Sequence, residues 1–236
     1  MSKLYLIPNS ISDQLVQGID INIGSIEHLR LFFVEEQKSA RRLLKQLNPD
    51  FPLQECTFHE LNEHSKPGDI KSYVHLLKKH DAGIISESGG PCAADPGADL
   101  VLLAHEQNID IIPLVGPSSI LLALMASGLG GQNFAFNGYL PKQEEERIKK
   151  IKLLEDRSSR EGQTQILMEP PYRNQPIFNE LLKTLQPQTL LSVAWDLTGK
   201  EQSIKTRKIQ EWQKLNIQLP KLPALFILSK TSLSHK

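Results

Sequence analysis

The chain has 236 residues, 39% of them apolar and 23% charged, so it has the composition of a folded globular protein with room for one large domain or two of about 100–120 residues. Its 27 basic and 27 acidic residues cancel, which excludes a strongly basic nucleic-acid binder and requires any nucleic-acid contact to be local. No apolar run reaches the length of a membrane span, and the first residues lack the apolar core of a signal peptide, so we expect a cytoplasmic protein with no membrane contact.

The first half of the chain alternates short apolar runs with amphipathic stretches, which is typical of an α/β domain. The segment from Ile11 to Ile26 has no clear period, and we assign it to a helix and a turn around Gly24. The other predictions are strands at Lys3–Ile7, Arg30–Val34, Ala82–Ile85 and Ile109–Leu114, and helices at Ser39–Leu47 and Ile70–Lys79.

The helix predicted at Ser39–Leu47 carries two stripes of opposite character. Its buried stripe consists of Ala40, Leu43, Leu44 and Leu47, spaced i, i+3, i+4 and i+7. Four cations repeat this spacing about 200° away round the helix, and this basic stripe consists of Lys38, Arg41, Arg42 and Lys45. A solvated charged face and a phosphate-binding surface both fit the pattern.

Two sharp turns follow predicted strands in the middle of the chain. Gly89-Gly90-Pro91 comes after Ala82–Ile85, and Gly116-Pro117 comes after Ile109–Leu114. The carboxyl ends of parallel strands meet at one edge of a sheet, where open α/β sheets bind ligands. Ser118 and Ser119 add hydroxyl and N–H groups beside a helix N-terminus. We therefore expect a cleft for a polar small molecule at this edge.

The second half continues the α/β alternation, and its character changes near residue 117. Predicted strands are Asn133–Leu140, Ile166–Met168, Leu190–Asp196, Glu201–Arg207 and Leu222–Leu228, with helices at Gln143–Asp156, Gln175–Leu185 and Lys208–Leu215 and a loop at Ser158–Gly162. We expect two α/β domains, residues 1–116 and 117–236, with a cleft between them.

No metal site is expected. His59 and His64 are five residues apart, which does not align two ligands on one helical face, and Cys56 and Cys92 lack the spacing of a zinc site or a disulfide framework.

The motifs, taken in order, resemble those of the tetrapyrrole methylase superfamily. They are Ser86-Glu87-Ser88-Gly89-Gly90-Pro91, Asp95-Pro96-Gly97, Val115-Gly116-Pro117-Ser118-Ser119 and Gly138-Tyr139-Leu140-Pro141-Lys142. Within this superfamily the chain is most similar to the bacterial branch that methylates a cytidine ribose 2′-hydroxyl of small-subunit ribosomal RNA. Weaker matches to that branch are Glu35-Glu36, His59 with Asn62-Glu63, Glu169-Pro170-Pro171-Tyr172-Arg173, and Asp196-Leu197-Thr198 with Lys200.

The resemblance implies two α/β domains of the tetrapyrrole methylase type, usually a homodimer, with S-adenosylmethionine bound between the domains. The cofactor contacts that it implies are Ser86, Ser88, Gly89, Gly90, Pro91, Ser118, Ser119, Met168, Ala194, Pro223 and Ala224. Glycines allow a close approach of the backbone, and turn N–H groups suit the methionine carboxylate of the cofactor.

The chain departs from the family's pattern at two places near the expected cofactor. The family's first turn reads Pro-Thr-Pro-Ile-Gly-Asn, whereas this chain has Pro8-Asn9-Ser10-Ile11-Ser12-Asp13, without the glycine. The family's Ser-Asp-Ala-Gly is Ser86-Glu87-Ser88-Gly89 here, so the acid is one methylene longer.

Methyl transfer to a ribose hydroxyl benefits from alignment and from a base that accepts the hydroxyl proton. Glu87 is the first candidate for this base because it lies where the family has Asp, and Glu36 is the second; a structural carboxylate in a cap or turn fits both positions equally well. Lys142 and Arg173 join the basic stripe as predicted RNA contacts, against the alternative of ordinary surface charges.

The leading hypothesis is an S-adenosylmethionine-dependent methyltransferase acting on ribosomal RNA or the small ribosomal subunit. A tetrapyrrole or other small-molecule methyltransferase is the alternative within enzymes. The changed first turn leaves a third hypothesis open, a protein that binds S-adenosylmethionine without catalysis.

Overall fold

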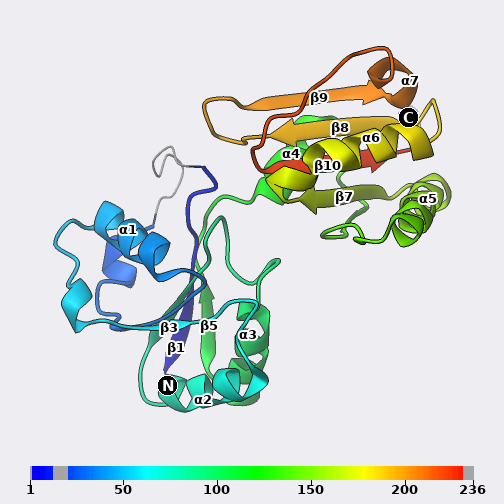
Figure 1. Cartoon of the computed structure of the whole chain (residues 1–236). Helices are drawn as coiled ribbons and strands as arrows, with labels where there is room; N and C mark the ends of the chain where they lie inside the picture. Colours follow the sequence, from blue (N-terminus) through cyan, green and yellow to red (C-terminus); the bar gives the residue numbers. More distant parts are fainter. Residues whose placement is uncertain (1, 13–20, 231–236) are drawn as a thin grey trace. The chain divides into compact units, whose positions relative to one another are not determined.

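A computed structural model describes residues 2–12 and 21–230 of the chain. The chain divides into two compact units, a first unit that ends at Ser118 and a second unit that begins at Ser119 (Figure 1). Each unit contains a five-stranded sheet and its own helices.

The first unit is built on a parallel sheet with the strand order β3-β2-β4-β1-β5. Its strands are β1 (Lys3–Ile7), β2 (Leu31–Val34), β3 (Thr57–Glu60), β4 (Ala82–Ile85) and β5 (Asp110–Pro113). Two central strands, β2 and β4, are apolar and buried throughout, and β1 is buried apart from Lys3 and the partly buried Leu6, because helices cover both faces of a parallel sheet.

Adjacent residues of β2 show how the two faces are filled. Phe32 packs into the cluster that includes Ala40, Leu43 and Leu44 of α1 (Gln37–Leu47), and Phe33 into the cluster on the opposite face. That second cluster includes residues of α2 (Pro67–Leu77) and α3 (Gly97–Glu106). Short 3-10 turns η1 (Ile23–Ser25) and η2 (Leu53–Glu55) complete the α1 side.

The second unit has a mixed sheet with the strand order β6-β7-β10-β8-β9, in which only β6 and β7 run parallel. Its strands are β6 (Phe134–Phe136), β7 (Thr164–Glu169), β8 (Leu190–Trp195), β9 (Ser203–Lys208) and β10 (Ala224–Ser229). The central strand β10 is buried throughout.

Helices cover both faces of this sheet as well. Its helical elements are α4 (Ser119–Ser127), α5 (Glu144–Glu161), η3 (Pro171–Arg173), α6 (Asn174–Thr184) and α7 (Ile209–Trp212). Residues of α5, α6 and α7 form one apolar cluster with Leu167, Val193 and Phe226 of the sheet. The helix α4 packs on β8, β9 and β10.

The predicted loop at Ser158–Gly162 is wrong, because α5 continues to Glu161. Ser158 is fully buried on the inner side of this helix, and its hydroxyl accepts a hydrogen bond from Lys230 N (2.9 Å). The helix ends at Gly162, which adopts the left-handed conformation typical of a glycine C-cap (φ 63°).

Other differences concern the ends of elements. The strand predicted at Asn133–Leu140 shortens to Phe134–Phe136, and the strand β3 replaces an unassigned stretch. Much of the helix predicted after Ile11 lies outside the described residues. The turn predicted around Gly24 is present as the 3-10 turn η1. Across the described ranges, no helix is both long and apolar enough to cross a membrane.

Candidate functional site

The loops after β1, β4 and β5 meet at the carboxyl edge of the first sheet, because β1 pairs with both β4 and β5. A Cβ atom added at Gly116 would lie 2.2 Å from Cβ of Pro8, so only glycine permits this contact between the loops. A Cβ atom added at Gly89 would lie 3.3 Å from the carbonyl oxygen of Pro117. The two predicted turns are therefore neighbours in space.

The segment Ser86–Pro91, here called the glycine loop, turns sharply at Gly89. Gly89 has φ +70°, a conformation that side-chain-bearing residues rarely adopt. The buried Ser86 hydroxyl donates to the Gly89 carbonyl (2.9 Å) and closes the loop on itself. Glu87 and Ser88 stay exposed at its tip.

The glycine loop has room and donors for an anionic group. A Cβ atom added at Gly90 would have no neighbour within 4 Å. In the part of the chain that the structure describes, the N–H groups of Gly89 and Gly90 donate no hydrogen bond. Free N–H groups in a turn at the end of a parallel strand fit the carboxylate of S-adenosylmethionine.

Glu35 lies at this edge beside Glu36, the residue that the sequence favoured as a candidate base. Its Oε2 accepts the Glu87 N–H (2.8 Å). Burial raises the pKa of the Glu35 carboxyl; the Glu87 N–H opposes the rise, and the nearby Asp95, Glu87 and Glu63 carboxylates add to it. The signal for Glu35 was its place, directly after a strand at the carboxyl edge.

Glu36 forms the N-cap of α1. Its two carboxylate oxygens accept the N–H groups of Lys38 (2.7 Å) and Ser39 (2.5 Å). These backbone hydrogen bonds hold the pKa of the Glu36 carboxyl below its usual value. Glu36 thus has the capping contacts of the structural alternative.

Asp95 and Cys92 lie in the turn that follows the glycine loop. Asp95 accepts the N–H groups of Cys92 and of Gly97, the first residue of α3, both at 2.8 Å. Burial, with a smaller effect of Asp95, raises the pKa of the Cys92 thiol to about 12. Cys92 is therefore a thiol at neutral pH and not a nucleophile.

The basic stripe lies on the exposed side of α1, as its phase predicted. All four side chains are exposed, and the apolar stripe faces the sheet. The Arg41 guanidinium lies over the Phe58 ring, 4.4 Å from its centroid, and Lys45 Nζ donates to the Pro49 carbonyl (2.6 Å). The stripe begins at Lys38, two residues after the Glu36 cap.

In the second unit, the register of the sheet places two predicted cofactor residues at the same level on the two strands that flank β10. Met168 on β7 and Ala194 on β8 both pair with Leu225 on β10. The Ala194 and Ala224 side chains are buried, whereas Met168 is half-buried and Pro223 is exposed. The Pro223 carbonyl accepts the Asp196 N–H (3.1 Å), so it belongs to the same end of the sheet.

The predicted cofactor residues are thus divided between the units. Those of the first unit are Ser86, Ser88, Gly89, Gly90, Pro91 and Ser118, and those of the second are Ser119, Met168, Ala194, Pro223 and Ala224. Among the described residues, no cluster of three or more His, Cys, Asp or Glu side chains could hold a metal ion.

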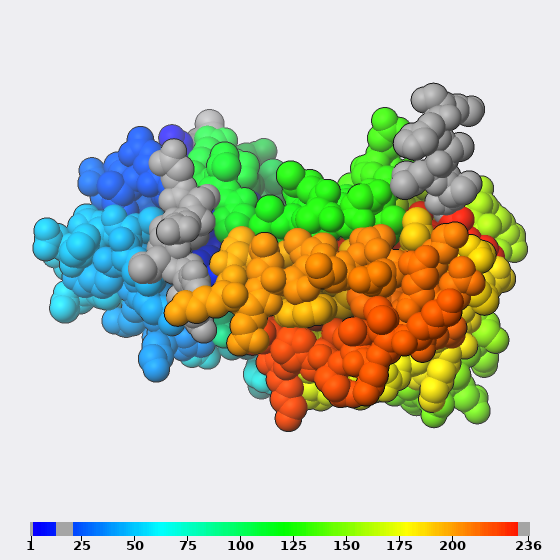
Figure 2. Space-filling view, turned by 90° about the horizontal axis from the view of Figure 1, so that it is seen from above, coloured from blue at the N-terminus to red at the C-terminus, as the bar shows by residue number. Residues whose placement is uncertain are grey.

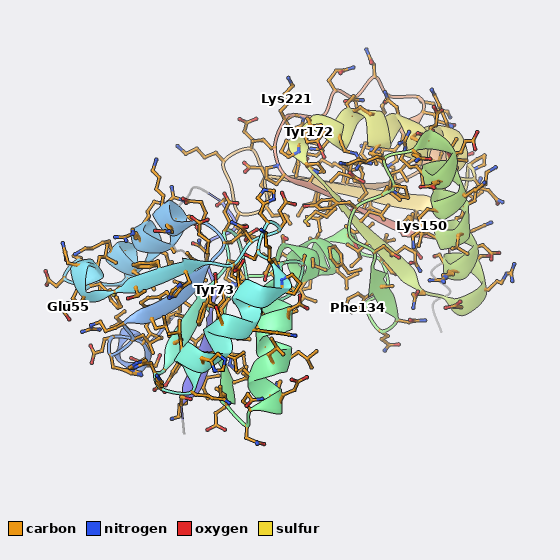
Figure 3. The ribbon with its side chains drawn as sticks, turned by 60° about the horizontal axis from the view of Figure 1, so that its bottom comes forward. Glu55, Tyr73, Phe134, Lys150, Tyr172 and Lys221 are labelled. Carbon is orange, nitrogen blue, oxygen red and sulfur yellow. The ribbon has the colours of Figure 1, made fainter. Side chains whose placement is uncertain are left out.

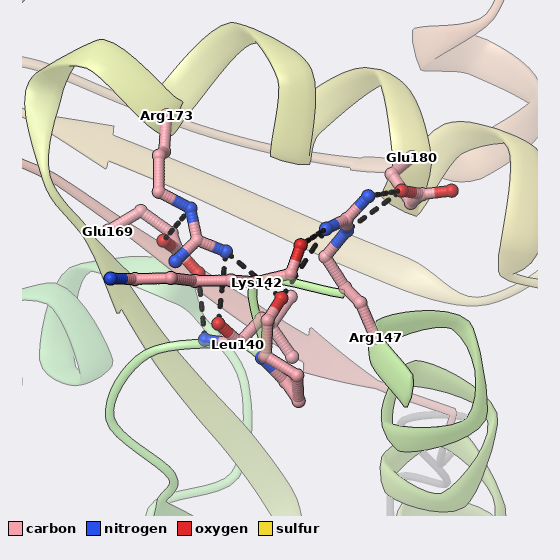
Figure 4. A network of polar contacts seen from close by, with 7 residues as sticks. Leu140, Lys142, Arg147, Glu169, Arg173 and Glu180 are labelled. Carbon is pink, nitrogen blue, oxygen red and sulfur yellow. Dashed lines mark hydrogen bonds and ion pairs between the residues drawn. The ribbon is translucent and has the colours of Figure 1, made fainter. Parts of the chain in front are cut away.

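Arg173 belongs to a network of polar contacts that we call the arginine network, in which the side chains of Arg147, Glu169, Arg173 and Glu180 contact one another and the backbone of Leu140, Pro141 and Lys142 (Figure 4). Arg173 Nη2 donates to the carbonyls of Leu140 (2.9 Å) and Pro141 (3.3 Å), and its Nε lies 3.2 Å from Oε2 of the fully buried Glu169 side chain. The Arg173 side chain is only 15% exposed. Little of the Arg173 side chain is therefore accessible for the predicted contact with RNA.

The same network holds Lys142 at the surface. Arg147 donates to the Lys142 carbonyl (2.8 Å) and binds Glu180 through two nitrogens (2.8 and 2.5 Å). Lys142 itself is exposed, and so is Tyr172, which Figure 3 labels. Exposed basic residues also occur on the edge strand β9, drawn in orange at the surface in Figure 2, where Lys205 and Arg207 alternate with partly buried residues.

No protein-family model matches the chain. Curated proteins nevertheless match most of it. The ribosomal RNA small subunit methyltransferase I of Synechocystis sp. (strain ATCC 27184 / PCC 6803 / Kazusa) is 29% identical over 198 residues, 84% of this chain and 68% of that protein. The protein of the same name from Buchnera aphidicola subsp. Baizongia pistaciae (strain Bp) is 28% identical over 232 residues, 96% of this chain and 75% of that protein.

Solved structures with a similar fold cover nearly the whole chain. A diphthine synthase is 13% identical with a TM-score of 0.64, over 98% of this chain and 91% of that one. A uroporphyrin-III C-methyltransferase from Thermus thermophilus, in complex with S-adenosylhomocysteine, is 13% identical with a TM-score of 0.52, over 97% and 98%. These likenesses confirm the two-domain α/β fold expected from the sequence.

Proposed function

We infer that this chain, a relative of the ribosomal RNA small subunit methyltransferases I within the tetrapyrrole methylase superfamily, is an S-adenosylmethionine-dependent methyltransferase. Its proposed substrate is small-subunit ribosomal RNA, and the proposed acceptor is a ribose 2′-hydroxyl. The names of its relatives support the substrate, and the bound S-adenosylhomocysteine of a protein with the same fold supports the cofactor.

The glycine loop is the observation that carries this proposal. It places the free N–H groups of Gly89 and Gly90 at the carboxyl edge of a parallel sheet, with open space beside Gly90. These groups would bind the carboxylate of the cofactor. For the second unit, the family resemblance proposes Met168 and Ala194 as apolar contacts of the adenine and the backbone near Pro223 and Ala224 as a further contact. When bound, the cofactor supplies an electrophilic methyl group on a sulfonium.

Glu87 is the proposed base for the ribose hydroxyl. Its side chain is exposed at the tip of the glycine loop, where it can reach a substrate, while its backbone is held by Glu35. Glu36 is the weaker candidate, since both of its carboxylate oxygens already accept hydrogen bonds from α1. Accepting the hydroxyl proton raises the nucleophilicity of the ribose oxygen for an in-line displacement.

The proposed RNA contacts are the basic stripe and Lys142, with Tyr172 as a ring on which a base can stack. Arg173 is not among them, because its guanidinium is used within the arginine network. A homodimer in the cytoplasm is part of the same proposal and rests on the family resemblance and on the ribosomal substrate of the relatives.

The test is transfer of labelled methyl from S-adenosylmethionine to small ribosomal subunits from a strain that lacks this gene, with uroporphyrinogen and precorrin as parallel acceptors. We expect label in the RNA, and a loss of about 100-fold or more with Glu87→Ala if Glu87 is the base. Glu106→Gln, which removes another exposed acid of the first unit, is the matched control.

Each other result selects a different hypothesis. Label in RNA that does not depend on Glu87 keeps the function and removes the proposed base. Label in a tetrapyrrole replaces the substrate class. Cofactor binding without transfer to any acceptor leaves a binding protein.

The contribution of the basic stripe is tested by the salt dependence of RNA binding. Alanine substitution of Lys38, Arg41 and Arg42 together is expected to make the plot of the logarithm of the RNA-binding constant against log salt less steep. The magnitude of its slope is expected to fall by about two, since each phosphate contact contributes about 0.7–0.9. The matched control removes three exposed cations of α5, Lys149, Lys152 and Arg157. Equal slopes for the wild-type protein and the stripe variant would rule out phosphate contacts by the stripe.

A further inference from the structure

The turn after β1 departs from the family's pattern, yet it makes specific contacts with the glycine loop. Asn9, where the family has Thr, is 3% exposed. Its Nδ2 donates to the carbonyls of Ser86 (3.1 Å) and Glu87 (3.0 Å), and its backbone N–H donates to the Gly89 carbonyl (2.8 Å). Its Oδ1 accepts the Ser10 N–H (2.8 Å), so the amide is fully used.

Glu35 also binds the backbone of Glu87, at its N–H group, whereas Asn9 binds its carbonyl. Its Oε2 accepts the Glu87 N–H (2.8 Å), and its own N–H donates to the Ile85 carbonyl (3.2 Å) at the end of β4. Glu87 is therefore fixed at both of its backbone polar groups, the N–H by Glu35 and the carbonyl by Asn9.

The sheet order explains why these two residues reach the loop. β4 lies between β2 and β1, and Glu35 follows β2 directly while Asn9 lies two residues beyond the end of β1. Each neighbouring strand thus supplies one side chain to the loop of the central strand. Threonine at position 9 has a single hydroxyl donor, whereas the Asn9 amide has two N–H groups for two carbonyls.

We propose that Asn9 and Glu35 are positioning residues that fix the glycine loop, so that the Gly89 and Gly90 N–H groups point at the carboxylate of the bound cofactor. The inference rests on the proposed function for the identity of that cofactor. A glycine-rich loop loses more conformational freedom on ordering than other segments, so a loop fixed before binding gives a higher affinity. The changed first turn is then an adaptation of this chain and not a sign of a lost site.

Paired substitutions separate positioning from other roles. Glu35→Gln keeps an oxygen that accepts the Glu87 N–H and removes the charge, whereas Glu35→Ala removes the acceptor. Asn9→Asp keeps the shape and places carboxylate oxygens against the two carbonyls that Asn9 now bonds. Glu63→Gln is the control for charge, because Glu63 adds to the electrostatic potential at Glu35 while its side chain is 86% exposed.

Two measurements are made on each full-length variant: affinity for S-adenosylhomocysteine by calorimetry, and amide hydrogen exchange of the peptide that spans residues 86–91. We expect affinity to fall about tenfold in Glu35→Ala and by more in Asn9→Asp, with faster exchange in the loop alone. Glu35→Gln and Glu63→Gln are expected to stay within about threefold of the wild-type affinity.

Unchanged affinity in Glu35→Ala and Asn9→Asp would overturn the inference, and so would slow exchange in both variants. A loss in Glu35→Gln as large as in Glu35→Ala would overturn it as well, because the charge and not the hydrogen bond would then matter. If the wild-type protein does not bind S-adenosylhomocysteine, the proposed function fails, whereas the positioning of the loop is still decided by the exchange rates.

Discussion

The glycine loop of the first unit and residues 140–142 of the second are held by different chemistry. In the first unit, Asn9, Ser86 and Glu35 fix the glycine loop through hydrogen bonds in which Glu35 is the only charged group. In the second unit, the arginine network fixes residues 140–142 with two guanidinium groups, which are paired with the carboxylates of Glu169 and Glu180 (Figure 4).

The difference lies in what is left when one partner is removed. A lost hydrogen bond between neutral groups costs about 1 kcal/mol when a second donor remains. A buried carboxylate that loses its cation costs about 3–5 kcal/mol, because the charge has neither water nor a partner. We therefore expect a single substitution to lower the free energy of unfolding by a small amount at the glycine loop and by a larger amount at the arginine network.

The largest effect is expected for Arg173→Ala. The Glu169 side chain is fully buried, and the variant leaves it with the Leu140 N–H (2.8 Å) as its only hydrogen bond among the described residues. The free energy of unfolding of the second unit is expected to fall by about 3–5 kcal/mol, measured by denaturant unfolding.

The double variant Arg173→Met with Glu169→Gln is the control, because it removes both charges together. It is expected to recover most of the loss. Equal destabilisation in the single and double variants would show that the packing of Arg173, and not its charge, is what the second unit requires.

A second effect is a pH dependence from Glu169. Burial raises the pKa of the Glu169 carboxyl, opposed by the Leu140 N–H and by Arg173 and Arg147. The folded protein therefore holds this proton to higher pH than the unfolded chain, and the folded state loses stability as the pH rises from the ordinary value of 4.5 through the raised pKa.

Glu169→Gln removes this titration. The stability of the wild-type protein relative to Glu169→Gln is expected to decrease as the pH rises through that window and to be constant above it, in unfolding experiments at a series of pH values. A stability difference that does not change with pH would mean that burial of Glu169 has no net effect on its proton.

The smallest effect is expected for Ser86→Ala in the first unit. The variant removes the hydrogen bond from the Ser86 hydroxyl to the Gly89 carbonyl, but that carbonyl still accepts the Asn9 N–H (2.8 Å). The loss is expected to be about 1 kcal/mol in the free energy of unfolding of the first unit. A loss as large as that of Arg173→Ala would contradict the distinction between the two loops.

Much of the fold follows from local patterns in the sequence. The apolar runs at Lys3–Ile7 and Ala82–Ile85 became strands within the predicted bounds, and the stripes of α1 predicted its buried and exposed sides. The loop predicted at Ser158–Gly162 failed because serines in a charged stretch resemble a turn until tertiary contacts bury one of them.

For the site, the sequence determined which residue types occur at the ends of the strands: glycines in the loop after β4, an acid at its tip and capping carboxylates before the helices. Tertiary structure alone decided their partners. Asn9 bonds Ser86 and Glu87, 77 and 78 residues away, and Arg173 turns inward to the carbonyls of residues 140 and 141. Such contacts depend on strand order and register, which bring distant segments to one edge, and no local period in the sequence encodes that order.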